Sequence, residues 1–121
     1  MTTFETLGLR PEILAALEKM GFATPTAVQA ETIPHILSSR QDLIALAQTG
    51  TGKTGAFSLP VLSQIDENLK RPQALILCPT RELCLQISKD IKAFLSEIPG
   101  IKVAAIYGGD SYVTQHNALF S

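Results

Sequence analysis

Residues 47–54 of this chain read Ala47-Gln48-Thr49-Gly50-Thr51-Gly52-Lys53-Thr54, between two apolar segments. A strand, a glycine-rich turn and the start of a helix, in this order, are typical of a site that binds phosphate groups. The glycines permit a tight turn in which several backbone N–H groups point at one anion. We expect Lys53 to place a positive charge on the β- and γ-phosphates and the Thr54 hydroxyl to hold Mg²⁺.

The same stretch has a simpler interpretation, an ordinary glycine-rich turn between a strand and a helix. The general pattern has glycine where this chain has Ala47, which weakens the match, but Gly52-Lys53-Thr54 is intact. A lysine at the start of a helix opposes the helix dipole unless an anion compensates it. We therefore favour the phosphate site over the simple turn.

The composition limits the class of protein. With 121 residues, 45% of them hydrophobic, the chain is at most one domain and can form a core. A formal net charge of −1 predicts no broad basic surface, so any contact with nucleic acid must be local. The cysteines Cys78 and Cys84 are not a C-x-x-C pair, and we expect buried thiols in a reducing compartment rather than zinc ligands. We find no secretory signal and no apolar run of the roughly 20 residues that a membrane helix needs, so we expect a cytoplasmic protein without a membrane segment.

Strands and helices are predicted to alternate. Apolar runs without polar alternation predict buried strands at 42–47, 74–78 and 102–107. The remaining pattern predicts helices over 9–20, from 27 with a kink or break at Pro34, from 53 to about 68 with a kink at Pro60, from 80 to 98, and over 112–120. This order favours an α/β fold, a parallel sheet flanked by helices with right-handed crossovers.

A possible base-reading segment, Gly21 to Gln29, lies upstream of the phosphate stretch. The amide of Gln29 has one acceptor and two donors, which match N6 and N7 of adenine. Phe4 could stack on the base. The residues alone favour equally a second interpretation, in which Gln29 is a surface helix residue and Phe4 an apolar staple.

Four motifs together resemble those of the DEAD-box RNA helicases. Residues 21–29 resemble the Q motif, with Val28 in place of the more usual isoleucine, and Phe4 resembles its upstream aromatic residue. Residues 47–54 resemble motif I, in which alanine is usual at the first position. Residues 79–83, Pro-Thr-Arg-Glu-Leu, resemble motif Ia, and Tyr107-Gly108-Gly109 resembles the glycine doublet that follows it. Each motif is weak alone, but four in the right order cover nearly the whole chain and are highly specific.

The resemblance implies ATP rather than GTP as the nucleotide and RNA as the partner. Gln29 and Thr24 would contact adenine, and Phe4 would stack on it. The phosphates and Mg²⁺ would be held by Thr49, Gly50, Thr51, Gly52, Lys53 and Thr54, of which Lys53 and Thr54 would support catalysis. The RNA backbone would be contacted, independently of base sequence, by Pro79, Thr80, Arg81, Gly108 and Gly109. From the residues alone, Arg81 and Glu82 would instead be a solvated first helix turn with a local ion pair.

Hydrolysis of ATP needs further residues that the sequence does not contain. An aspartate directly after an apolar strand should hold Mg²⁺, and a neighbouring glutamate should act on the attacking water. Pro79 follows one predicted strand and Gly108-Gly109 the other, with Asp110 too far along. The Asp-Glu-Ala-Asp and Ser-Ala-Thr motifs of the family and its second RecA-like domain are also missing.

We therefore expect residues 1–121 to be the N-terminal part of the first RecA-like domain, a partial P-loop NTPase domain that does not itself turn over ATP. Two other classes stay open: a self-standing nucleotide-binding module without catalysis, and a different P-loop enzyme such as a small kinase or GTPase. The Q-motif-like segment speaks against the last class, and equal binding of GTP and ATP would favour it.

Overall fold

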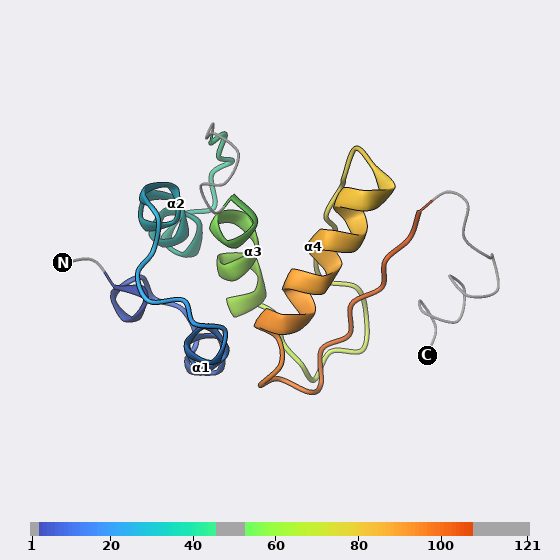
Figure 1. Cartoon of the computed structure of the whole chain (residues 1–121), viewed down its shortest axis with the longest axis horizontal. Coiled ribbons are helices and arrows are strands. Elements are labelled where there is room, and N and C mark those ends of the chain that lie inside the picture. The colour runs from blue at the N-terminus through green and yellow to red at the C-terminus, as the bar shows by residue number, and fades with distance from the viewer. Residues whose placement is uncertain (1–2, 46–52, 108–121) are drawn as a thin grey trace.

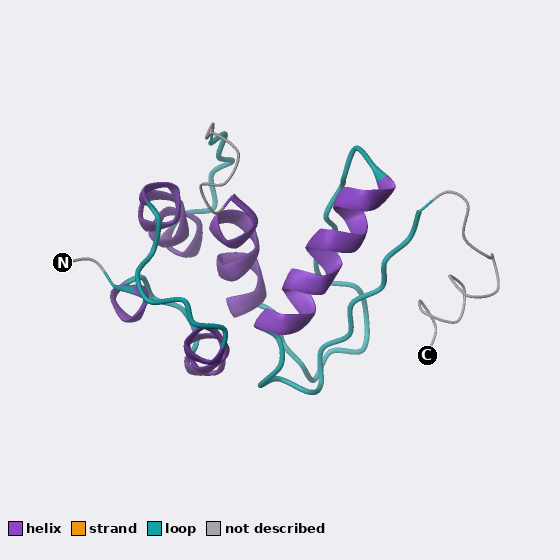
Figure 2. Cartoon of the chain, in the orientation of Figure 1, coloured by secondary structure: helices purple, strands orange, loops and turns teal. Residues whose placement is uncertain are grey.

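The computed structural model describes residues 3–45 and 53–107 (Figure 1). This part contains a short 3₁₀ helix, η1 (Phe4–Thr6), and the helices α1 (Pro11–Lys19), α2 (Ala27–Ser38), α3 (Lys53–Ser63) and α4 (Arg81–Phe94). The other described segments are turns or extended chain (Figure 2). None of the helices described here is both long and apolar enough to span a membrane.

The ends of α1, α2 and α4 follow from local sequence. Thr26 and Thr80 cap α2 and α4, where their hydroxyl oxygens accept from the backbone N–H groups of Gln29 and Leu83. Gly21, at φ 81°, ends α1 in a conformation that favours glycine, and the next N–H, that of Phe22, donates to the carbonyl of Leu17 at 2.9 Å.

Three predicted helix features differ from the structure: α2 has no break at Pro34, α3 ends before residue 68, and α4 ends at Phe94 rather than at residue 98. Helix α2 continues through Pro34 to Ser38 without a break, because its packing on α3 outweighs the hydrogen bond that proline cannot make. Helix α3 ends at Ser63, not near residue 68, because the side chain of Asp66 accepts from the N–H of Asn68 at 2.9 Å and starts a turn.

Helix α3 is the centre of the packing. It contacts α1, α2 and α4, and Figure 1 shows it between α2 and α4. Ile13 of α1, Ile33 of α2 and Leu59 of α3 are fully buried, at 0% exposure. The buried hydroxyl of Thr32 donates to the carbonyl of Ala56 at 3.2 Å and joins α2 to α3. The position of the helix that begins with Lys53 is therefore fixed by the core.

The predicted strands are not regular strands in the described residues. The segments 42–45, 72–78 and 101–107 are extended or irregular and form no ladder there. Burial nevertheless alternates along 101–107, where the odd-numbered residues are half-buried and the even-numbered ones exposed. Likewise Ile76 packs against the core, whereas Leu75 and Leu77 are 84% and 85% exposed. The period of two is that of a strand, but only one face of each segment is covered. An apolar run favours an extended backbone, but it does not supply the neighbouring strand that a ladder of hydrogen bonds requires.

Candidate functional site

Lys53 and Thr54 open helix α3. Lys53 is exposed and Thr54 half-buried. The first turn of α3 contains no acidic residue, so nothing there repels an anion from the unpaired N–H groups of the helix start. An exposed cation and a hydroxyl at such a helix start fit a phosphate with its metal ion. The predicted phosphate ligands Thr49, Gly50, Thr51 and Gly52 lie outside the described residues.

Gln29 is buried, at 3% exposure, although it lies in the first turn of α2. Its Oε1 accepts from the backbone N–H of Thr26 at 3.0 Å, which completes a capping box. A Cβ added at Gly55 would lie 2.8 Å from Nε2 of Gln29. The interpretation of Gln29 as a surface residue is therefore wrong: its side chain packs directly on α3, two residues after Lys53.

The two other residues predicted to contact adenine differ in exposure. Thr24 is exposed in the loop before α2. Phe4 is buried at 3% exposure, with its ring centroid 6.3 Å from that of Phe22. Phe22 is 38% exposed and meets the ring of Phe94 edge-on at 6.0 Å. Stacking of Phe4 on adenine stays a prediction and requires the Phe4 ring to turn out of the core. Of the three phenylalanine rings in this cluster, that of Phe22 is the accessible one, and the sequence had indicated no role for it.

The substitution Gly55→Ala tests the contact between Gln29 and α3. The new methyl group must displace the amide of Gln29, while alanine is a better helix former than glycine by about 1 kcal/mol. We expect the melting temperature to change little and the affinity for ATP to fall about three- to tenfold, the equivalent of one hydrogen bond. Isothermal titration of the variant with Mg·ATP measures this.

A double variant serves as the control. If the loss arises through Gln29, adding Gln29→Ala to Gly55→Ala lowers the affinity no further than Gln29→Ala alone. Independent, additive losses would show that Gly55 acts by another route.

Pro79, Thr80 and Arg81 are exposed at the start of α4. The Thr80 hydroxyl accepts from the N–H of Leu83 at 3.1 Å and keeps its own proton to donate. The guanidinium carbon of Arg81 lies 5.0 Å from the centroid of the Tyr107 ring. Arg81 and Glu82 are both exposed, as the alternative interpretation of a solvated first turn expects. No ion pair joins these two residues in this described stretch, so the local ion pair of that interpretation is wrong. Gly108 and Gly109 lie outside the described residues.

Cys78 and Cys84 flank the motif that contains Arg81, and both are free thiols of intermediate burial. Burial raises the pKa of Cys78, and the neighbouring thiol of Cys84 raises it further. Within the described ranges, no three histidine, cysteine or acidic side chains gather where they could hold a metal ion.

We expect Cys78 to be alkylated slowly by iodoacetamide in the folded chain, because only the thiolate reacts and a raised pKa lowers its fraction at a given pH. The midpoint of the rate against pH should lie above that of the urea-unfolded chain, and Cys84→Ser should move it part of the way back. Trypsin cleaves after Arg81 and separates the two cysteines for mass spectrometry. Equal midpoints for folded and unfolded chains would contradict the expected shift.

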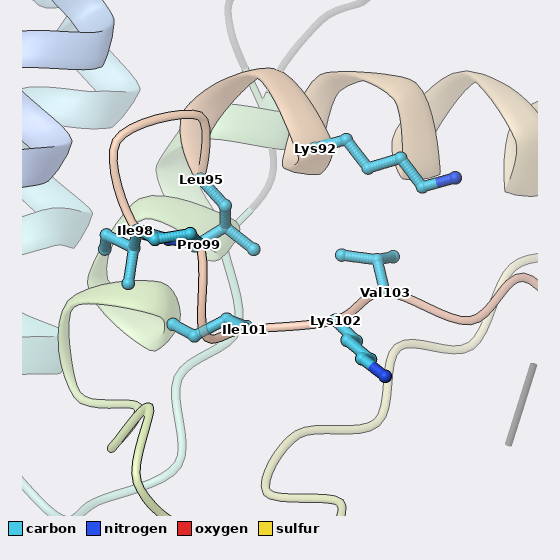
Figure 3. A pocket seen from close by; sticks show the side chains of 7 residues that line it. All are labelled: Lys92, Leu95, Ile98, Pro99, Ile101, Lys102 and Val103. Atoms are coloured by element: carbon cyan, nitrogen blue, oxygen red, sulfur yellow. The ribbon is translucent and has the colours of Figure 1, made fainter. Parts of the chain in front are cut away.

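A separate open pocket of about 360 Å³ lies at the other end of α4 (Figure 3). Two lysines flank an apolar floor, and none of the residues predicted from the sequence to bind nucleotide or RNA lines it. The lining residues are Lys92, Leu95, Ile98, Pro99, Ile101, Lys102 and Val103.

Comparison with known proteins identifies the family. The family model of the DEAD/DEAH box helicases matches residues 26–121, and the chain belongs to this family. It is 49% identical, over 118 residues, to the "ATP-dependent RNA helicase DeaD" of Escherichia coli strain K12. The aligned region covers 98% of this chain and 19% of the E. coli protein.

Solved structures of other DEAD-box proteins superpose well on this chain. A DEAD box protein from the hyperthermophile Methanococcus jannaschii superposes with a TM-score of 0.90 at 38% identity, over 98% of this chain and 32% of that one. The RNA helicase Prp28 of Chaetomium thermophilum, bound to ADP, superposes with a TM-score of 0.87 at 41% identity, over 98% and 30%. The chain thus spans about a fifth of the length of this curated relative and about a third of that of the solved ones.

Proposed function

We propose that this chain binds Mg·ATP and the RNA backbone as part of a cytoplasmic ATP-dependent RNA helicase, which couples ATP hydrolysis to the unwinding of RNA duplexes. Residues 1–121 would form the N-terminal part of its first RecA-like domain, with the segments 42–47, 74–78 and 102–107 as parallel strands. The observation that carries the proposal is the packing of Gln29 on α3 at Gly55, in the first turn of the helix that contains Lys53 and Thr54. This packing supports a nucleotide site in which the adenine and phosphate residues belong to neighbouring helices.

For the nucleotide, each residue has a separate task. Lys53 places its charge on the phosphates, and the Thr54 hydroxyl supplies an oxygen ligand of the kind that Mg²⁺ prefers. The bound metal would neutralise phosphate charge. Gln29, whose Oε1 accepts a hydrogen bond from Thr26 and whose amide carries both donors and an acceptor, would distinguish adenine from guanine. Burial favours this selectivity, because a wrong base would leave a buried amide unsatisfied.

For RNA, the start of α4 supplies three kinds of donor. The unpaired backbone N–H groups of the helix start, the proton of the Thr80 hydroxyl and the guanidinium of Arg81 all suit a phosphate oxygen. All three residues from Pro79 to Arg81 are exposed. Contacts of this kind carry no base sequence, so we expect RNA binding to be independent of sequence.

Catalysis by the chain itself is not expected. Lys53 and Thr54 would bind and orient the phosphates, but the sequence offers no aspartate and glutamate at the end of a strand for the metal and the attacking water. The purified chain should therefore bind ATP without turnover, and phosphate release that depends on Lys53 would contradict this.

Nucleotide selectivity tests the proposal. Isothermal titration of the chain with Mg·ATP and Mg·GTP should give at least tenfold tighter binding of ATP, because the pairing of Gln29 with adenine is lost with guanine. Gln29→Ala should remove most of the difference between the two nucleotides. Equal affinities in the wild-type chain would refute adenine recognition and favour another P-loop protein.

A further inference from the structure

The Arg81–Tyr107 pair joins two segments that are distant in sequence. Arg81 is the first residue of α4, and Tyr107 belongs to the extended segment 101–107, which runs back along this helix (Figure 1). The Sγ of Cys84, one turn into α4, lies 4.0 Å from the carbonyl oxygen of Ile106. Tyr107 also belongs to the half-buried set of its segment. The ring of Tyr107 is therefore held beside the helix start.

The contact with Tyr107 leaves Arg81 able to bind, with its guanidinium carbon over the ring at 5.0 Å from the centroid. A cation over an aromatic ring is attracted through the face of the ring. The five N–H donors of a guanidinium point outward along its planar edge, so contact with a single ring leaves donors of this edge for another partner. Because Arg81 has no ion pair with Glu82 in the described residues, this edge is not used by a neighbouring carboxylate there.

We infer that Tyr107 is a positioning residue, which holds the guanidinium of Arg81 beside Thr80 and so orients it for an RNA phosphate. The inference rests on the proposed RNA contact of Arg81. An exposed arginine otherwise samples many rotamers, and fixing them on binding lowers the affinity. The Tyr107 ring restricts these rotamers before RNA arrives. Tyr107 itself contributes no phosphate contact in this scheme.

RNA affinities of single and double variants test the inference. The probe is a fluorescently labelled, single-stranded oligouridine, measured by anisotropy with the whole chain and a non-hydrolysable ATP analogue. We expect Arg81→Ala to weaken binding about tenfold, as for one charge-assisted contact. Tyr107→Leu should weaken it about two- to fivefold, whereas Tyr107→Phe, which keeps the aromatic face, should bind as the wild type does.

The double variant separates positioning from a general structural effect. If Tyr107 acts through Arg81, Tyr107→Leu causes no further loss in the Arg81→Ala background. A loss of the same size in both backgrounds overturns the inference. Should Tyr107→Leu unfold the chain, Tyr107→Trp takes its place. Because the larger ring keeps the contact with Arg81, this variant should bind RNA at least as well as the wild type. Weaker RNA binding with an unchanged melting temperature overturns the inference.

The outcomes also distinguish the inference from the proposed function. If Arg81→Ala leaves RNA affinity unchanged, the RNA role of this helix start fails, and the inference fails with it. If Arg81→Ala weakens binding but Tyr107→Leu does not, the RNA contact stands and only the positioning role is refuted.

Discussion

Lys53→Ala should strongly weaken ATP binding while the chain stays folded. Lys53 is exposed at the first position of α3 and is absent from the core, so its side chain contributes little to stability. Replacing a cation at a helix start with alanine should even favour the helix slightly. In contrast to this small effect on stability, the loss of the charge-assisted contact between Lys53 and the phosphates should lower the affinity for ATP about 10- to 100-fold.

Thermal unfolding with and without Mg·ATP measures both effects at once. ATP at about 100 times its dissociation constant stabilises a folded binder by roughly 2.7 kcal/mol, so the wild-type melting temperature should rise clearly. Lys53→Ala should show the same melting temperature without ATP and, at the same ATP concentration, a smaller rise that corresponds to only about 0.4–1.4 kcal/mol. Lys89→Ala, which removes an exposed lysine from α4, is the matched control and should respond as the wild type does. An undiminished rise in Lys53→Ala would show that the nucleotide binds elsewhere.

Local signals predicted much of the helical structure. Thr26 and Thr80 precede apolar periodic segments, and each caps the helix that follows it. The end of α1 before Gly21 was also predicted correctly, and Lys53 is helical as expected. Such features depend on residues within four positions of one another, so sequence alone contains the necessary information.

Features that depend on distant contacts were missed or wrong. The continuity of α2 through Pro34 comes from packing against α3, which is not visible in the local sequence. Gln29 was left as either a base reader or a surface residue, and its burial results from Gly55, which lies on another helix. The signal that could have suggested this is a glycine early in a predicted helix, where close approach of another group is a common reason. Likewise nothing near Arg81 in the sequence indicated Tyr107.

The apolar runs that were predicted as strands also show that sequence alone does not reveal distant contacts. Their composition predicted strands buried on both faces, but Leu75 and Leu77 are largely exposed and the segment forms no ladder in the described residues. The period-two burial along 101–107 fits a strand with one covered face. Composition predicts the conformation that a segment can adopt, whereas pairing and burial depend on its neighbours.

Leu59→Ala should cause the largest loss of stability among the single substitutions considered for this chain. Leu59 is fully buried in α3, the helix that contacts the three other α-helices described here. Truncating a buried leucine removes its transfer free energy and leaves a cavity, at a cost of about 2–5 kcal/mol. A typical domain is stable by only about 5–15 kcal/mol, so a large fraction of the chains should unfold at modest urea concentrations. In urea titrations the midpoint should fall while the slope stays the same.

Leu85→Ala provides the matched control, because Leu85 is also helical but 42% exposed, and its loss should cost well under half as much. Since α3 also contains Lys53, ATP should recover part of the lost stability in Leu59→Ala and at most about half as much in the double variant with Lys53→Ala. Equal midpoints for Leu59→Ala and Leu85→Ala would show that the packing around α3 is not the main source of stability. Equal recovery by ATP in Leu59→Ala and in the double variant would instead show that nucleotide binding does not depend on Lys53.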